Sequence, residues 1–138
     1  MKFKYSEYIG PNSTKIFRPT VPIIFKNKSK FIQTEAIIDS GADFTILPIE
    51  LAGILELKLD GRKKTTFHGA GSNPFTVYPS PVKIEHILRQ EKFRPIKWKT
   101  NIFFAESQPG ILLGHKGFLE NFRVTLDGKR KEIEINQR

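Results

Sequence analysis

The stretch AIIDSGADFTILP, residues 36–48, decides how this chain of 138 residues is built. Runs rich in β-branched and aromatic residues at 36–38 and 44–47 predict two strands. The Asp-Ser-Gly triplet at 39–41 interrupts them, because Asp and Gly are both depleted in strands. Residues that disfavour strands, placed inside a hydrophobic segment, are typical of a tight turn or of a functional site.

Two interpretations of Asp39 follow from its setting. A carboxylate before Ser and Gly commonly caps nearby backbone N–H groups in a turn. Here, however, apolar residues on both sides imply that the turn lies on the hydrophobic core, where an ionised carboxylate is costly unless it is compensated. That cost favours a functional role for Asp39 over a purely structural one.

Strand patterns continue over most of the chain and predict an all-β fold with one or two short helices. Extended runs are expected at residues 21–25, 31–38, 65–67, 82–88, 96–104, 111–113, 122–126 and 132–135. The turns at 26–30 and at Asp127-Gly128 predict hairpins. Residues 48–57 and 116–121 are the expected helical segments. Residues 1–20, with Gly10-Pro11 and Pro19, are expected to form an irregular arm before a single domain of residues 21–138.

Composition limits the chemistry that the chain can perform. It contains no cysteine, which excludes disulfides, thiolate nucleophiles and cysteine-bound metals. Its histidines, His68, His86 and His115, show no metal-ligand spacing, so no metal and no cofactor are expected. Because we find no long apolar run, and no secretory h-region in the opening MKFKYSEY, we expect a soluble, cytoplasmic protein without a membrane partner.

The net charge of +9 is the one unusual bulk property. Basic residues concentrate before residue 31, at 62–64 and at 129–131. Such an excess can attract nucleic acid by counterion release. The basic residues are nevertheless spread over turn-like segments and form no stripe studded with aromatic residues. Nucleic acid is therefore an alternative partner that the pattern does not favour.

The segment IIDSGA, residues 37–42, resembles the active-site motif of the retroviral-type (retropepsin-like) aspartic proteases, in which two hydrophobic residues precede Asp-Thr/Ser-Gly-Ala. A second family element, an apolar pair followed by Gly and a short helix, is similar to residues 111–114 and the 115–120 segment behind them. The glycine-bearing segment FHGAGSNPF, residues 67–75, lies where the family has its flap. The resemblance extends over residues 20–127 and implies an acid-protease half-domain with a closed β-barrel.

The resemblance also implies an aspartic endopeptidase that acts on peptide or protein substrates as a homodimer. The reaction needs two carboxylates that share a proton. No second D-S/T-G triplet occurs in the chain, so a two-fold dimer has to supply the second Asp39. Carried over by the motif, the catalytic residues are Asp39, Ser40 and Gly41. The substrate-binding residues are Ala42, Asp43, His68, Gly69, Ala70, Gly71 and Leu112.

The chain departs from the viral pattern in three places. In viral members an arginine follows the glycine of the second family element. This arginine pairs with an Asp four residues beyond the catalytic Asp. Here His115 follows Gly114, so a pair between His115 and Asp43 is expected. Residues 132–135 are expected to supply or replace the interfacial strands, and the insertion at 87–99 to extend the sheet or bind a partner.

Two alternatives to the protease remain open from the sequence. One is a catalytically weak retropepsin-like module that binds peptides or dimerises. The other is a basic, nucleic-acid-associated β-protein.

Overall fold

The computed structural model describes residues 1–69 and 73–138; the expected flap residues Ala70 and Gly71 lie outside the described residues. The predicted all-β class is confirmed, with one α-helix, α1 (Glu50–Ile54), and two 3-10 turns, η1 (Pro11–Ser13) and η2 (Gly61–Lys63), in the described part. The strands are β1 (Lys2–Lys4), β2 (Ser6–Ile9), β3 (Lys15–Arg18), β4 (Thr20–Asn27), β5 (Lys30–Ile38), β6 (Ile46–Pro48), β7 (Thr65–Phe67), β8 (Phe75–Pro79), β9 (Ile84–Leu88), β10 (Ile96–Thr100), β11 (Phe103–Ala105), β12 (Leu112–Leu113), β13 (Phe122–Asp127) and β14 (Glu132–Gln137).

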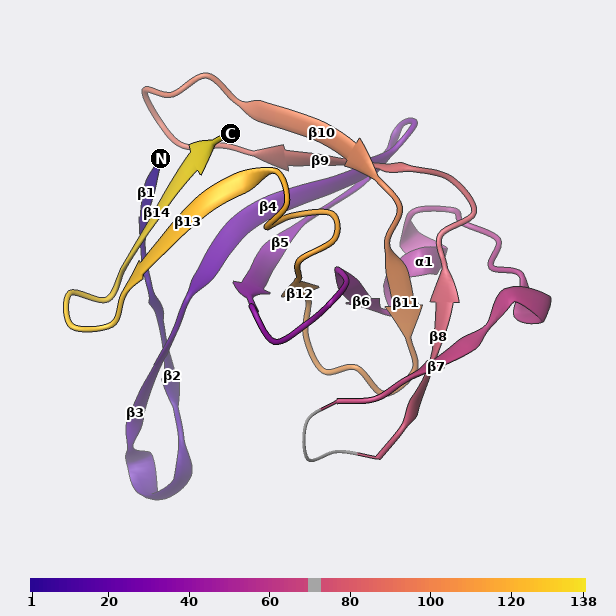
Figure 1. The fold of residues 1–138 in the computed structure, drawn as a ribbon, viewed down its shortest axis with the longest axis horizontal. Helices are drawn as coiled ribbons and strands as arrows, with labels where there is room; N and C mark the ends of the chain where they lie inside the picture. Colours follow the sequence, from indigo (N-terminus) through magenta and orange to yellow (C-terminus); the bar gives the residue numbers. More distant parts are fainter. Residues whose placement is uncertain (70–72) are drawn as a thin grey trace.

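Nine strands form the main sheet, in the order β10-β9-β4-β5-β12-β6-β11-β8-β7 (Figure 1). In the described residues β10 and β7 each pair with one strand only, so the sheet is open between them rather than the closed barrel that we expected. Hairpin β9–β10 adds two strands at one edge, which is one of the two roles expected for the 87–99 insertion.

The β4–β5 hairpin shows how the sequence directs the sheet. Val21, Ile23 and Phe25 are buried on one face, while Pro22 and Lys26 point outward, as alternation along a half-buried strand requires. The tight turn between the strands has Lys28 at a φ of 54°, in the left-handed region. The hairpin predicted around residues 26–30 is thus confirmed.

The first twenty residues are not irregular, contrary to expectation. Strand β1 pairs with β14, with Lys2 opposite Glu134, and Phe3 packs against the core. Strands β2 and β3 pair with each other around η1, so Gly10-Pro11 opens a hairpin turn instead of ending regular structure. We call residues 6–18 the arm. In Figure 1 it projects away from the body of the protein.

The C-terminal hairpin predicted around Asp127-Gly128 is confirmed as β13–β14. Strand β14 lies between β1 and β13, so residues 132–135 already have strand neighbours on both sides within one chain. The helix expected at 116–121 is instead a set of turns, in which Leu119 N–H donates to Gly114 O, five residues back, at 3.0 Å. Gly117, at a φ of 93°, interrupts the helix.

Two hydrophobic clusters support the sheet. The larger one fills the space under β4, β5, β9, β13 and β14. The smaller one contains buried Ile46, Val77 and Ala105, against which four half-buried phenylalanines pack. This second cluster lies next to the Asp39 loop, since Phe44 belongs to both. Among the described residues no helix has the length and apolar character needed to cross a membrane.

Candidate active site

Three strands hold Asp39 in place. The residue follows β5, and β12 is inserted between β5 and β6, parallel to the first and antiparallel to the second. The Asp39 N–H donates to Leu113 O at 3.0 Å, which extends the β5–β12 ladder by one residue. The loop that joins β5 to β6 therefore emerges from the interior of the sheet with its first residue fixed.

The Asp-Ser-Gly turn then fixes the carboxylate. The Gly41 N–H donates to Asp39 Oδ1 at 2.8 Å, and the Ala42 N–H donates to Asp39 O at 3.2 Å. A Cβ atom at position 41 would lie 3.2 Å from Oδ1, so glycine lets the backbone approach the carboxylate without crowding it. Asp39 therefore does cap the turn, as one of the two interpretations expected. Its other carboxylate oxygen, Oδ2, accepts no hydrogen bond from the described residues and can bind other partners.

Residues 114–116 clamp the far side of the loop. The N–H groups of His115 and Lys116 donate to Ala42 O at 2.9 Å and Asp43 O at 2.8 Å. A Cβ at Gly114 would come within 2.6 Å of Ala42 O, a contact that real side chains do not make. The second family-like segment, residues 111–114, thus braces the first one directly.

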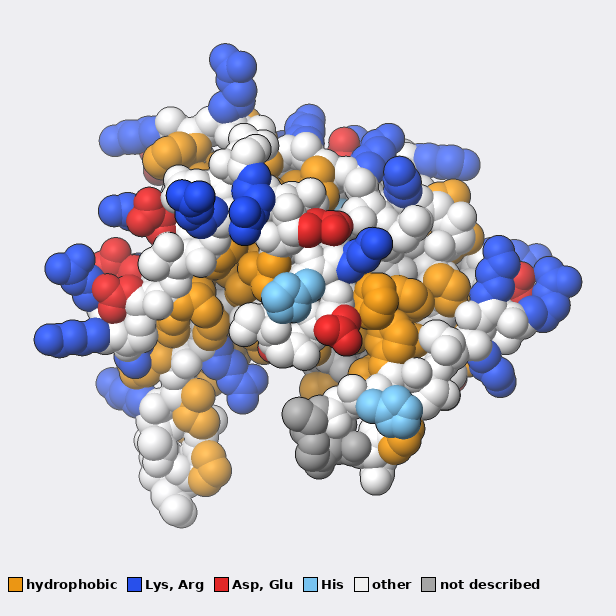
Figure 2. Space-filling view, in the orientation of Figure 1, with side chains coloured by type: hydrophobic (Ala, Val, Ile, Leu, Met, Phe, Trp, Pro, Cys, Tyr) orange, Lys and Arg blue, Asp and Glu red, His pale blue; other side chains and the backbone are white. Residues whose placement is uncertain are grey.

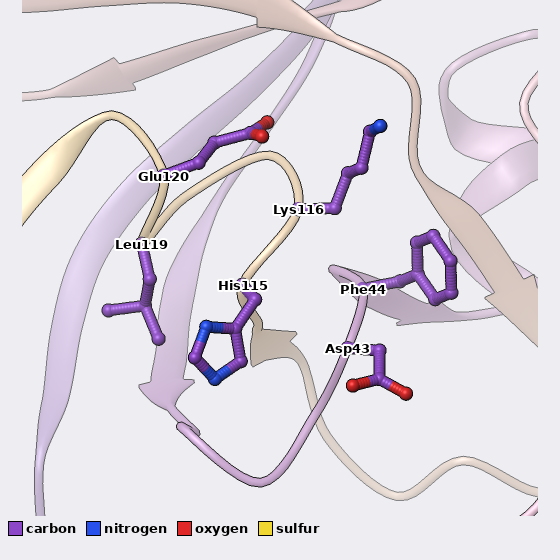
Figure 3. A pocket seen from close by; sticks show the side chains of 6 residues that line it. All are labelled: Asp43, Phe44, His115, Lys116, Leu119 and Glu120. Atoms are coloured by element: carbon purple, nitrogen blue, oxygen red, sulfur yellow. The ribbon is translucent and has the colours of Figure 1, made fainter.

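His115 does not pair with Asp43, contrary to expectation. Its Nε2 atom lies 2.7 Å from Ser40 O and donates to that carbonyl, so Nε2 carries a proton. Among the described residues no salt bridge reaches Asp43. Figure 3 shows that the Asp43 carboxylate does not point at the imidazole. The physical reason is that the imidazole N–H is already used by the Ser40 carbonyl of the turn.

A cavity of about 610 Å³ opens beside Asp39. Of the predicted residues, Asp39, Gly41, Ala42, Asp43, His68, Gly69 and Leu112 line it. Ser40 does not line it, because this residue lies on the exposed side of the turn with its carbonyl bonded to His115. The lining residues that were not among the predicted site residues are Phe44, Ile46, Thr66, Phe67, Phe75 and Gln108.

One wall of the cavity is aromatic. The Phe44 and Phe67 rings line it and stack with centroids 5.1 Å apart. Phe103 is not in the lining but supports both rings edge-on, at 5.0 and 4.8 Å. Phe75 meets Phe67 edge-on across the β7–β8 pair. This wall joins the Asp39 loop to hairpin β7–β8, so an apolar side chain can be held between them. Figure 2 shows the hollow between that hairpin and the arm.

Ionisable groups outside the cavity are shifted by their surroundings. The pKa of Tyr78 is raised by partial burial and by Glu106, whose Oε1 accepts the phenol proton at 3.2 Å. The pKa of His86 is lowered to about 4 by burial in the core. Within residues 1–69 and 73–138, no group of three His, Asp or Glu side chains is arranged to hold a metal ion.

Comparison with known proteins gives likenesses among solved structures and none elsewhere. No protein-family model matches the chain, and no curated protein does. The chain is similar in fold to a retropepsin-like aspartic protease from Rickettsia conorii, with 20% sequence identity, a TM-score of 0.47, and coverage of 98% of this chain and 96% of that chain. The function has to be inferred from this chain's own residues.

Proposed function

We propose that the protein is an aspartic endopeptidase whose active form is a homodimer, with one Asp39 from each copy. The observation that carries this proposal is the Asp39 carboxylate, which is fixed by the Gly41 N–H at 2.8 Å and faces a cavity of about 610 Å³. The IIDSGA motif at residues 37–42 gives the same assignment from the sequence. A carboxylate that is held by backbone and open to a cavity is suited to proton transfer.

The reaction requires two carboxylates in different protonation states. An ionised Asp39 takes a proton from water as the water oxygen attacks the scissile carbonyl, while the protonated Asp39 of the second copy donates a hydrogen bond to the carbonyl oxygen. Collapse of the tetrahedral intermediate breaks the C–N bond. The proton that the first Asp39 took from water passes to the nitrogen of the amine that leaves.

Hairpin β7–β8 gives the substrate a place to bind. Strand β7 is an edge of the main sheet, so its outward backbone groups can pair with an extended peptide. The aromatic wall beside it would hold an apolar side chain of that peptide. Peptides with large apolar residues next to the cleaved bond are the expected substrates.

Two Asp→Asn substitutions, one at the cavity and one outside it, test the proposal. Digestion of a peptide library between pH 4 and 7, with and without a pepsin-class inhibitor, should show cleavage that Asp39→Asn lowers by about a thousandfold. Asp60→Asn is the matched control and should keep cleavage, because Asp60 accepts the Arg62 N–H at 3.0 Å and does not line the cavity. Comparable cleavage by the Asp39→Asn protein would rule out the proposal. Retained peptide binding without any cleavage by the wild type would instead favour a binding module.

A mixing experiment tests the dimer itself. If each active unit needs two intact Asp39 residues, equal amounts of wild-type and Asp39→Asn chains should leave about a quarter of the dimers active. Activity that falls only in proportion to the wild-type fraction would mean that a single chain is competent.

A further inference from the structure

The arm is a two-stranded hairpin without a neighbouring strand. In the described residues β2 and β3 pair only with each other, in the register Glu7 opposite Phe17 and Tyr8 opposite Ile16. A two-stranded hairpin is marginally stable at best in water, so an element of this kind gains stability from a further contact.

The arm exposes apolar side chains on both of its faces. Of the eight large apolar side chains exposed in the described residues, three lie in the arm: Ile9 is 73% exposed, Phe17 39% and Tyr8 38%. Ile9 and Phe17 belong to one face, and Tyr8 to the other, because directly paired residues share a face. Apolar exposure that is concentrated in a projecting element marks an interaction surface.

The base of the arm is tied to the Asp39 turn. Pro19 O accepts the N–H of Ile38, the residue before Asp39, at 2.9 Å. On the other strand, the Ser6 hydroxyl bonds the Thr20 hydroxyl, and the Tyr5 N–H donates to Lys131 O at 2.9 Å. The direction of the arm is therefore set by the same strands that position the catalytic candidate.

We propose that the arm clasps a second copy of this chain, an inference that rests on the proposed function. In Figure 1 the Asp39 loop lies between the arm and hairpin β7–β8, and Figure 2 shows that the space between these two projections is open. A second copy that brings its Asp39 to this loop enters that space and comes to lie against the arm. By symmetry its own arm lies against the first copy.

The charge of the arm favours a second copy over an acidic partner. The chain carries a net charge of +9, yet residues 8–14, which form the tip, contain no charged residue. An uncharged tip can contact an equally basic copy without adding repulsion. An arm that binds nucleic acid would instead present Lys or Arg at its tip.

The test compares the same substitution at two exposed isoleucines. Ile9→Lys puts a positive charge on the arm. Ile54→Lys does so on α1, where Ile54 is 54% exposed; α1 lies far from the arm in Figure 1. Sedimentation over a range of concentrations should show that Ile9→Lys raises the dimer Kd about tenfold or more, while Ile54→Lys leaves it unchanged. Peptidase activity of Ile9→Lys should be low in dilute solution and recover as the protein concentration rises.

A spin label gives a second measurement that does not depend on a disruptive variant. Because the chain has no cysteine, Ile9→Cys and Ile54→Cys each provide a single labelling site. A label at position 9 should lose mobility as the protein concentration rises, and a label at position 54 should not. The clasp would be overturned if the two Lys variants had the same dimer Kd and the two labels lost mobility equally. A wild type that stays monomeric at every concentration would overturn it as well.

The results separate the clasp from the enzymatic proposal. If Ile9→Lys weakens the dimer while Asp39→Asn leaves cleavage intact, the clasp stands and the dyad fails. If Asp39→Asn abolishes cleavage while Ile9→Lys leaves the dimer Kd unchanged, the dyad stands and the clasp is wrong.

Discussion

Asp39 and His86 are both ionisable side chains set among apolar residues, and the fold treats them in opposite ways. Asp39 is half-buried, receives the Gly41 N–H at 2.8 Å and faces a cavity. His86 is fully buried between Phe25 and Trp98, and its Nε2 atom has no hydrogen-bond partner among the residues that the structure describes. Its Nδ1 donates to Ile84 O at 2.8 Å, so the ring is held as a neutral packing group.

The difference shows what distinguishes a site from a buried polar residue. Asp39 has a backbone donor and open space beside its carboxylate, so the carboxylate can meet another molecule. His86 has neither, and burial lowers its pKa to about 4. A polar residue in a hydrophobic segment is therefore a functional candidate only when the surrounding backbone supports its charged form. Three substitutions test this contrast, and they follow in order of the expected effect.

Gly114→Ala should have the largest effect, because it attacks the support of the Asp39 turn. The added methyl group would lie 2.6 Å from Ala42 O, and backbone atoms cannot move away as a flexible side chain would. We expect a loss of about 3 kcal/mol in the free energy of unfolding, measured by urea denaturation. Gly110→Ala is the control, since a Cβ at position 110 meets nothing within 4 Å. If the two variants are equally stable, the clamp on the turn is unimportant.

The sequence marked the two segments that form this support, but it did not predict the contact between residues 42–43 and 115–116. Each segment is recognisable from a few adjacent residues: Asp-Ser-Gly between two apolar runs, and an apolar pair before Gly114. The hairpin around Asp127-Gly128 was predicted for the same reason, since its turn chemistry lies in two adjacent residues.

The aromatic wall could not be predicted in this way. Phe44, Phe67 and Phe103 meet only because β11 pairs with β6 on one side and β8 on the other. Such pairings join residues far apart in the sequence, and no local pattern encodes them. The local pattern predicted a helix at 116–121, whereas the φ of 93° at Gly117 that breaks it occurs where the backbone packs closely against Thr100 and Thr45.

His86 should produce a smaller effect that appears only in acid. The folded-state pKa of about 4 lies below the value of 6.5 for a free histidine, so the unfolded chain binds more protons between these pH values. Stability from this residue is fully present above about pH 7 and falls as the pH drops, by about 2 kcal/mol at pH 5. Denaturation of the wild type at pH 5 and pH 7.5 measures this slope.

Substitution shows whether His86 causes that slope. His86→Leu removes the titrating ring, so its stability should change less between the two pH values, whatever its absolute stability. His68→Leu is the control, because that side chain is exposed and its loss should leave the slope as it is. If His86→Leu keeps the wild-type slope, protonation of His86 is not what lowers the stability in acid, and the contrast between His86 and Asp39 fails.

His115→Ala should have the smallest effect of the three. It removes the hydrogen bond from Nε2 to Ser40 O at 2.7 Å, which lies on the exposed side of the turn where water can replace the donor. We expect a loss of about 1 kcal/mol, since an exposed hydrogen bond contributes little after exchange with water. Lys116→Ala, at the next exposed position, is the control and should change stability by less than about 0.5 kcal/mol. Equal stabilities would mean that the backbone bonds of residues 115 and 116 hold the turn without help from the imidazole.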